Sequence, residues 1–344
     1  MQSAGSFQKF IVPFSQKLLA IDVASLPTNN YSSRYLQHLL QEHLYYLHIY
    51  ASVLHLLQAH SKKPASQIAL ADFGSGNGLL GLFAKFAGFK QVWLCDMDAA
   101  FVNSSRLLAT KLELNMDGFV TGSIAELESA VSGHTLDAVI GTDVIEHIYS
   151  VPHFLQTMAH INPEMVTVFT TASNPHNYLK CRQLIKLQLQ DELQGSNPED
   201  FDLAGPTATP AFLQMRKEII ADKFPAMEPT VLQQLAASTR GMRASDILTA
   251  AEDFVRTGVM PSLTDKWPNT CHPLTGTFTE RILSIKDYGN MFAATGFQLK
   301  VYNGFYNVQA GGLKKNVNSF RNLFVKLTGK YAAPFISLVG YKSA

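Results

Sequence analysis

Apolar and polar positions vary along the chain in a way that predicts both helices and short strands. Between about residues 33 and 60, leucines and a tyrosine recur at spacings of three, four and seven, which predicts one long amphipathic helix. From about 66 to 172, short apolar runs alternate with helical stretches. This alternation is typical of a parallel sheet whose strands are joined by crossover helices.

The apolar runs predict seven strands. Five precede residue 172, at 67–73, 91–95, 119–120, 136–140 and 165–170, and two lie near the C-terminus, at 297–302 and 335–339. Helices are expected between them at 79–87, 99–114, 124–131, from Pro152 onward, 285–295 and 318–328.

Residues 175–275 interrupt this alternation of strands and helices. Four helices are expected there, at 178–194, 211–222, 229–239 and 245–257, with Gly- and Pro-bearing linkers between them and no strand. We therefore expect an α/β protein with a seven-stranded Rossmann-like sheet. Its expected parts are an N-terminal helical cap (1–62), a core (63–174 and 276–344) and a helical insertion acting as a substrate lid (175–275).

A glycine-rich segment, Asp72-Phe-Gly-Ser-Gly-Asn-Gly78, lies between the first expected strand and its helix, and Asp96 ends the second strand. Glycines let the backbone pass close to a ligand, and a carboxylate at a strand tip can accept hydrogen bonds from ribose hydroxyls. The order of strand, loop, helix, strand and acid therefore predicts a nucleotide site. The alternatives are a simple tight turn for the glycines and a helix N-cap for Asp96.

Two classes of nucleotide ligand could account for this pattern. The spacing is GxGxG rather than the GxGxxG of dinucleotide sites, because Leu79 stands where the third glycine would fall. Asp72 suits the positively charged end of a ligand, whereas a pyrophosphate would prefer a helix N-terminus free of anions. Both features favour S-adenosylmethionine, whose amino group and sulfonium are cationic.

These motifs resemble the class I S-adenosylmethionine-dependent methyltransferases. The resemblance rests on the glycine segment, on Val92-Trp-Leu-Cys-Asp96 and on Leu136-Asp-Ala-Val-Ile-Gly-Thr-Asp-Val-Ile-Glu-His147, which is similar to the ubiquinone-biosynthesis branch. It covers about residues 66–172 and 284–341. It implies methyl transfer with S-adenosylhomocysteine as the second product.

The resemblance also implies the cofactor contacts. The glycine loop would lie against the methionine moiety, Asp96 would hold the ribose, and Asp143 would lie beside the reacting centre. After the third strand the family often has an acid near the adenine, where this chain has Gly122-Ser-Ile124, so that contact would fall to the Ser123 hydroxyl or the Ile124 backbone. The expected cofactor residues are Asp72, Gly74, Ser75, Gly76, Gly78, Asp96, Met97, Ser123, Ile124 and Asp143.

Methyl transfer to a neutral amine or hydroxyl also requires a proton acceptor. His147 is the candidate general base, since histidine accepts protons near neutral pH, and Asp143 and Glu146 are the other candidate catalytic residues. Alternatively, Glu146 and His147 order the next helix. No third ligand is spaced to complete a metal site with them, so no metal is expected.

The acceptor is expected to meet residues outside the glycine loop. The candidates are Asn174, His176, Tyr35, Trp267 and His272. Each has a structural alternative as a loop or packing residue. Arginines of the insertion (Arg182, Arg216, Arg240, Arg243 and Arg256) could pair with an acidic group of the acceptor.

The amino-acid composition narrows the range of partners and functions that the protein can have. The chain is 47% hydrophobic and 16% charged, with 28 basic and 27 acidic residues, which argues against nucleic acid as a partner. Three scattered cysteines and the lack of an 18-residue apolar stretch favour a cytoplasmic protein with no membrane partner. We expect a small-molecule O- or N-methyltransferase and leave a homodimer open; the alternatives are a protein methyltransferase and a non-catalytic S-adenosylmethionine-binding scaffold.

Overall fold

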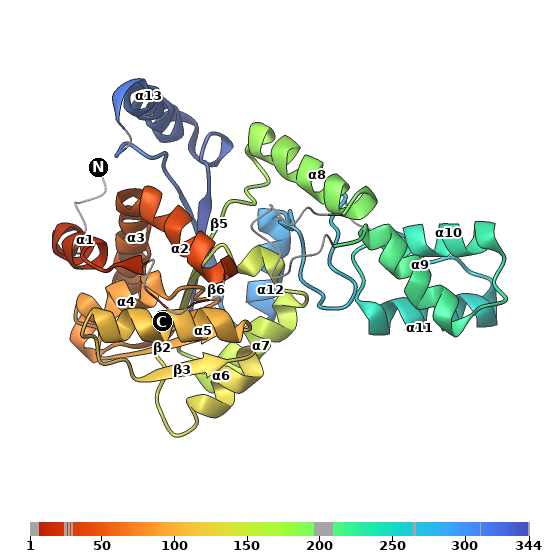
Figure 1. Cartoon of the computed structure of the whole chain (residues 1–344), viewed down its shortest axis with the longest axis horizontal. Helices are drawn as coiled ribbons and strands as arrows, with labels where there is room; N and C mark the ends of the chain where they lie inside the picture. Colours follow the sequence, from red (N-terminus) through yellow and green to blue (C-terminus); the bar gives the residue numbers. More distant parts are fainter. Residues whose placement is uncertain are drawn as a thin grey trace. The chain divides into compact units, whose positions relative to one another are not determined.

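The computed structural model describes residues 7–23, 26, 28, 30–195, 209–263, 266–309 and 311–342. The chain divides into two compact units (Figure 1). Unit 1 comprises residues 1–145, 150–172 and 285–344, and unit 2 comprises residues 146–149 and 173–284.

Unit 1 is built on a seven-stranded mixed sheet. Its strands are β1 (Ala69–Phe73), β2 (Gln91–Asp96), β3 (Gly118–Thr121), β4 (Ala138–Thr142), β5 (Val166–Thr171), β6 (Gln298–Asn303) and β7 (Ile336–Tyr341). The order across the sheet is β3-β2-β1-β4-β5-β7-β6, with β1 to β5 parallel and β7 antiparallel to both of its neighbours. Because the chain turns in opposite directions on either side of β1, the carboxyl end of β1 is a topological switch point.

The central strands are buried along their length, which explains their continuous apolar sequences. The helices of unit 1 are α1 (Ile11–Leu19), α2 (Asn30–Gln41), α3 (His43–Ser61), α4 (Leu79–Phe86), α5 (Ala99–Lys111), α6 (Ile124–Ala130), α7 (Val151–Ile161), α12 (Ile285–Ala294) and α13 (Gly312–Thr328). Helices α1, α3 and α4 form one packed group and α6, α7 and α12 another. Short 3-10 turns occur at Gln8–Phe10, Ala65–Gln67, Ile145–His147 and Gly329–Tyr331.

The expected fold is confirmed: all seven predicted strands exist, and their ends differ from the prediction by a few residues at most. One expectation for the N-terminus is wrong. The predicted helix at 33–60 is two helices, because the backbone leaves the helical region at Glu42 (φ −121°). The helices of the expected cap share one apolar core with the sheet, in which Phe14 and Leu54 pack in the same cluster as Leu70.

Unit 2 consists largely of helices. They are α8 (Tyr178–Leu193), α9 (Phe212–Lys223), α10 (Pro229–Ser238) and α11 (Ala244–Thr257), close to the predicted ranges. Helices α9, α10 and α11 pack together, as the teal helices in Figure 1 show, around Ile220, Leu235 and Ile247. The insertion thus has an apolar core of its own, and its function as a lid stays a prediction.

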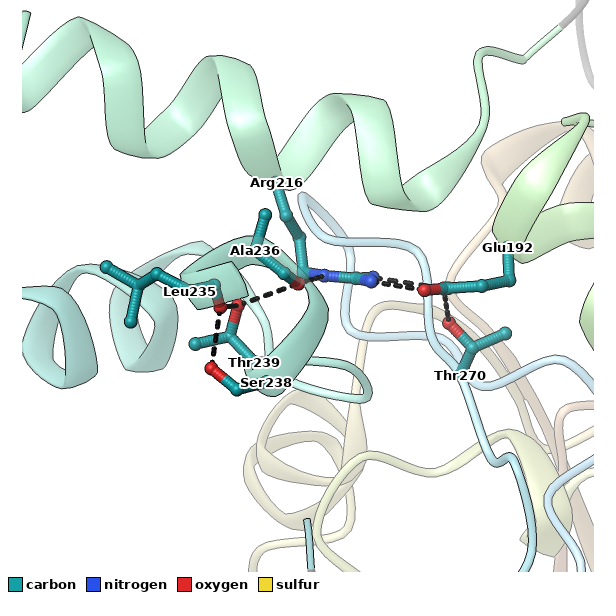
Figure 2. A network of polar contacts seen from close by, with 7 residues as sticks. All are labelled: Glu192, Arg216, Leu235, Ala236, Ser238, Thr239 and Thr270. Atoms are coloured by element: carbon teal, nitrogen blue, oxygen red, sulfur yellow. Dashed lines mark hydrogen bonds and ion pairs between the residues drawn. The ribbon is translucent and has the colours of Figure 1, made fainter. Parts of the chain in front are cut away.

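A buried ion pair joins three of these helices (Figure 2). The Arg216 side chain on α9 is fully buried, and its guanidinium donates two hydrogen bonds to the Glu192 carboxylate on α8. Its Nε also donates to the carbonyl of Ala236 on α10 (2.8 Å), and the Thr270 hydroxyl donates to Glu192 (2.7 Å). Arg216 is therefore a structural residue, and its guanidinium is already paired with an acid of the protein.

We predict that Arg216→Met lowers the free energy of unfolding of unit 2 by about 3–5 kcal/mol, because Glu192 would keep a buried charge without its cation. The double variant Arg216→Met/Glu192→Met should recover most of this loss. Urea unfolding followed by Trp267 fluorescence in a Trp93→Phe background measures it, since the chain has two tryptophans and Trp267 packs within unit 2.

The matched control is Arg256→Met. Arg256 forms an ion pair with Asp253 at 2.6 Å, but both side chains are more than half exposed, so the loss should be below about 1 kcal/mol. Equal losses for the two single variants would contradict a special role for the buried pair.

Candidate functional site

The glycine loop follows β1 at the switch point of the sheet. Gly74, Gly76 and Gly78 all have positive φ angles, between 52° and 77°, which side chains rarely adopt. A Cβ on Gly74 would lie 2.3 Å from the Val144 side chain, and a Cβ on Gly78 would lie 2.7 Å from Ser105. The loop conformation therefore requires glycine at these positions.

Asp96, at the tip of β2, holds this loop. Its Oδ2 accepts a hydrogen bond from the Gly76 N–H (2.8 Å), and its Oδ1 accepts one from the Asp98 N–H (2.9 Å). The N-cap function belongs instead to Asp98, whose carboxylate accepts from the Ala100 N–H (2.8 Å) at the start of α5. A carboxylate has about four acceptor positions, so Asp96 retains capacity for two ligand hydroxyls.

Asp72 is the second carboxylate beside the loop. It is 2% exposed, and its Oδ2 accepts a hydrogen bond from the Gly81 N–H (2.8 Å) in the first turn of α4. Burial raises the pKa of Asp72 to about 8, although the Gly81 bond opposes this, and the negative charge of Asp96 raises it further. Burial also raises the pKa of Asp96. Two carboxylates that are costly to ionise together would be stabilised by a nearby cation.

Tyrosines of the N-terminal helices lie close to these carboxylates. Tyr35 on α2 contacts the loop, because a Cβ on Gly76 would lie 3.5 Å from its ring. Burial, followed by the charge of Asp143, raises the pKa of Tyr46 to about 12. Burial also raises the pKa of Tyr50, with smaller contributions from nearby charged and phenolic groups that include Asp72.

Asp143, just after β4, has a strained backbone with φ 51°. Its N–H donates to the Thr170 carbonyl (2.9 Å), and its Oδ1 accepts from the Ala172 N–H (3.3 Å). These bonds join the ends of β4 and β5 at the same edge of the sheet as the glycine loop.

Ser123 caps helix α6. Its hydroxyl accepts from the Ala125 N–H (3.2 Å) and donates to Glu126 (2.6 Å), which in turn accepts from the Ser123 N–H. This capping box accounts for the Ser123 hydroxyl, so the contact to adenine that we expected from it has a competing structural explanation. Ile124 is buried as the first residue of α6, and Met97, next to Asp96, is 69% exposed.

His147 and Glu146 belong to unit 2. The His147 Nδ1 lies 2.7 Å from the carbonyl oxygen of Phe278. Because a carbonyl can only accept, Nδ1 carries the proton in the neutral ring and Nε2 is the basic nitrogen. Glu146 is fully buried, and its carbonyl accepts a hydrogen bond from the Arg281 N–H (3.3 Å).

The other candidate acceptor residues also lie in unit 2. Asn174 is buried, and its Oδ1 accepts from the His176 N–H (3.1 Å), which orders the loop after β5. Trp267 packs against the cluster of Cys181, Leu184 and Ile282. The ring nitrogen Nδ1 of His272 accepts from the backbone of the next turn, and burial lowers its pKa. These contacts support the structural alternatives for Trp267 and His272, and their part in acceptor binding stays a prediction.

Among the arginines of unit 2, those at surface positions have partners of their own. Arg243 and Arg256 form ion pairs with Asp246 and Asp253. In the described part of the chain, the buried Nε atoms of Arg240 and Arg281 have no hydrogen-bond partner. The Arg281 guanidinium also lies 4.2 Å from the centre of the Phe278 ring. The carbonyl of the same Phe278 accepts the hydrogen bond from His147.

Two curated proteins show local sequence similarity to this chain. Both are named ribosomal protein L11 methyltransferase and come from Prochlorococcus marinus, strains MIT 9303 and MIT 9313. The first is 35% identical over 86 residues (24% of this chain) and the second 28% identical over 130 residues (37%). The matches span 29% and 43% of those proteins' own lengths. No protein-family model matches the chain.

The strand order with its single reversed strand, the glycine loop after β1 and the acid ending β2 occur here together with this similarity. The motifs and this local similarity resemble those of the class I S-adenosylmethionine-dependent methyltransferases. The seven-stranded sheet itself has the Rossmann-like methyltransferase fold that the sequence predicts. The narrower resemblance to the ubiquinone-biosynthesis branch stays a prediction.

Solved structures with a similar course of the chain include methyltransferases. One is magnesium protoporphyrin IX methyltransferase from Synechocystis PCC 6803 with bound S-adenosylhomocysteine, 11% identical, with a TM-score of 0.39 over 97% of this chain and 96% of that one. Another is an S-adenosylmethionine-dependent methyltransferase from Mesorhizobium loti, 11% identical, with a TM-score of 0.38 over 83% of this chain and 95% of that one. Neither likeness determines a substrate.

Sequence reasoning did not select three tyrosines of α3 that lie near Asp143. Tyr45, Tyr46 and Tyr50 all have raised pKa values, chiefly through burial and to a smaller extent through Asp143. A cluster of phenols on a helix that is otherwise apolar was the available signal. Within the described residues no group of three His, Cys, Asp or Glu side chains could hold a metal ion, and no helix is long and apolar enough to cross a bilayer.

We predict that Asp72 makes unit 1 less stable as the pH rises. Since its pKa is raised from 3.8 to about 8 by folding, the folded chain holds a proton that the unfolded chain loses between those values. The free energy of unfolding should fall over this range by up to about 1.4 kcal/mol per pH unit. Asp72→Asn, which can still accept from Gly81, should lack this contribution.

Urea unfolding at several pH values without cofactor measures the difference, using Trp93 fluorescence in a Trp267→Phe background. Trp93 reports on unit 1 because it lies on β2 in register with Ala71 of β1. Parallel pH profiles for the two proteins would contradict a buried, protonated Asp72.

Proposed function

We propose that this protein is a methyltransferase that binds S-adenosylmethionine at the carboxyl ends of β1 and β2. The observation that carries the proposal is the pair of buried carboxylates, Asp72 and Asp96, beside a loop of three left-handed glycines. Because both carboxyl groups have raised pKa values, a cationic ligand would favour their ionised forms, whereas the pyrophosphate of a dinucleotide would oppose ionisation. The resemblance of the motifs and the names of the curated relatives support the same activity.

The chain's residues fit this cofactor by their chemistry. Asp96 would accept the ribose hydroxyls, and the loop from Gly74 to Gly78 leaves room beside the methionine moiety. The exposed Met97 side chain would provide apolar surface for the adenine, and the Ile124 backbone a polar contact to it. Bound S-adenosylmethionine supplies an electrophilic methyl group and a thioether leaving group. Asp143 and Tyr35 line the same end of unit 1.

We propose His147 as the proton acceptor. Its Nδ1–H is fixed by the Phe278 carbonyl, so Nε2 can take a proton from an amine or hydroxyl as the new bond to the methyl group forms. The arrangement of one fixed nitrogen and one basic nitrogen is typical of catalytic histidines. Glu146, which is buried next to it in the chain, positions this segment through its backbone bond to Arg281.

The acceptor proposed first is a small molecule with an acidic group. The buried Nε atoms of Arg240 and Arg281 suit a carboxylate or phosphate, and the balanced charge of the chain suits a small substrate better than a polyanion. A protein side chain is the second candidate, because both curated relatives are named for ribosomal protein L11. Release of S-adenosylhomocysteine is measured with small amino or hydroxy acids and, separately, with purified L11, which distinguishes the two candidates. If no S-adenosylhomocysteine is released with either class of acceptor, the result would favour a binding scaffold.

For the cofactor, Asp96→Ala should weaken the affinity for S-adenosylmethionine about tenfold to a hundredfold, because charge-assisted hydrogen bonds to ribose would be lost. Titration calorimetry at pH 7 and pH 8 measures the affinity. Asp98→Ala is the matched control: it removes the N-cap of α5, costing about 1 kcal/mol of stability, and should leave the affinity unchanged.

Two results would count against the cofactor site. Absence of binding to the unaltered protein at both pH values would overturn the proposed function. Unchanged affinity in Asp96→Ala would restrict Asp96 to holding the loop.

For the base, His147→Asn should lower kcat about 100-fold or more while the affinity for S-adenosylmethionine stays unchanged, because the amide can still donate to Phe278 but cannot take a proton. Steady-state kinetics and calorimetry measure the two quantities. The control is His160→Asn, an exposed histidine paired with Glu128, which should retain normal kcat. Near-normal kcat in His147→Asn would show that alignment alone supports turnover.

A further inference from the structure

Most apolar side chains of helix α13 of unit 1 (dark blue in Figure 1) are exposed, Val325 being the buried exception. They recur at alternating spacings of four and three residues, so they form one stripe along the helix. The stripe, which we call the outer face of α13, comprises Leu313, Val317, Phe320, Phe324, Leu327 and Tyr331 just beyond the helix end. Leu313 is 83% exposed, Phe320 61% and Leu327 74%, whereas the apolar stripe of a surface helix normally faces the core.

Polar contacts hold the helix in this orientation. The Asn318 side chain is buried, and its Nδ2 donates to the Asn307 carbonyl (2.7 Å). Asn322 both accepts from the Tyr306 N–H (2.7 Å) and donates to the Tyr306 carbonyl (3.0 Å). Because these bonds are specific and satisfied, rotation of α13 to bury its outer face would break them.

The charged side chains of the C-terminal segment are all basic, and one of them, Lys314, forms an ion pair with Glu42 (2.9 Å). From residue 288 to residue 344 the chain contains seven basic residues and no aspartate or glutamate, although the whole chain is balanced at 28 and 27. Five of the seven lie on or directly after α13: Lys314, Lys315, Arg321, Lys326 and Lys330. By helical position Lys314 and Arg321 lie on one side of the outer face and Lys330 on the other, whereas Lys315 and Lys326 lie closer to the opposite side of the helix.

An apolar stripe of leucines and phenylalanines between rows of Lys and Arg is the pattern of helices that lie in the plane of a membrane interface. We propose that α13 docks this protein onto the surface of an anionic phospholipid bilayer. The leucines and phenylalanines enter the headgroup and acyl boundary while the basic side chains meet lipid phosphates. This binding is peripheral, and it revises the expectation of no membrane partner made from the absence of a spanning segment.

Charge decides between a bilayer and a second copy of the chain. Two outer faces packed together would bring the basic rows of both helices close, with no acid on either helix to compensate. A bilayer containing phosphatidylglycerol supplies both the apolar layer and the negative charge.

Sedimentation with vesicles tests the proposal. The unaltered protein should bind vesicles of phosphatidylglycerol and phosphatidylcholine in 50 mM salt, at least tenfold more tightly than pure phosphatidylcholine, and binding should weaken in 500 mM salt. Leu313→Ser/Phe320→Ser/Leu327→Ser should lower the partition coefficient at least tenfold. Its matched control, Val12→Ser/Leu19→Ser, removes similarly exposed apolar side chains from α1 and should bind normally.

Should the triple serine variant unfold, Arg321→Glu/Lys330→Glu reverses the charge of one basic side chain on each side of the outer face and should also bind at least tenfold more weakly. In addition, Phe320→Trp in a Trp93→Phe/Trp267→Phe background should shift its emission to the blue with anionic vesicles and not with neutral ones.

Three results would overturn the proposal. One is a lack of binding of the unaltered protein to anionic vesicles at low salt, and another is unchanged binding of both α13 variants. The third is a dimer in analytical ultracentrifugation that the triple serine variant converts to a monomer, which would assign the outer face to a second copy. None of these measurements depends on methyl transfer, so they test the surface separately from the proposed function.

Discussion

A single hydrogen bond, from the Gly76 N–H to the Asp96 carboxylate, sets the geometry at the ligand end of unit 1. It joins the loop after β1 to the tip of β2, and it can form because Gly74, Gly76 and Gly78 all adopt left-handed backbone angles. The loop shape and the acceptor for a ribose are therefore two aspects of one contact. Any substitution that moves Asp96 also moves the backbone on which the cofactor would rest.

The carboxylates of this site also set a limit on its stability. Asp72 is held by Gly81 within the first turn of α4, and burial makes its ionisation costly. An apolar residue there would avoid this cost but would lose both the hydrogen bond and the attraction to a cationic ligand. The site at the glycine loop is thus less stable than its surroundings, because its proposed chemistry requires charged groups there.

Much of this fold could be predicted because its determinants are local. Short apolar runs ending at Phe73 and Asp96, with a glycine loop between, indicate the parallel strands and the site on their tips. The break at Glu42 could not be predicted, since the apolar spacing continues through it. The union of the N-terminal helices with the sheet also depends on long-range packing, such as that of Phe14 against Phe83, which no local pattern encodes.

The hydrogen-bond and ion-pair partners of individual side chains were the least predictable part of the structure. Arg216 has the sequence context of a surface arginine, yet Glu192 and the Ala236 carbonyl pair with it inside unit 2. Ser123 was expected at the adenine and forms a capping box with Glu126. Such assignments depend on which residues meet in space, and a one-dimensional pattern constrains that weakly.

The pairing of β5 with β7 has a consequence for how the chain is made. Thr171 of β5 pairs with Ile336 of β7, 165 residues later, and all of residues 173–284 are synthesised in between. Unit 2 contains mainly local helical contacts and so folds early, while β5 waits as an open sheet edge. Its unpaired backbone groups can join the edge of another chain during this interval. The helical insertion therefore lengthens the time during which a nascent molecule is exposed to aggregation.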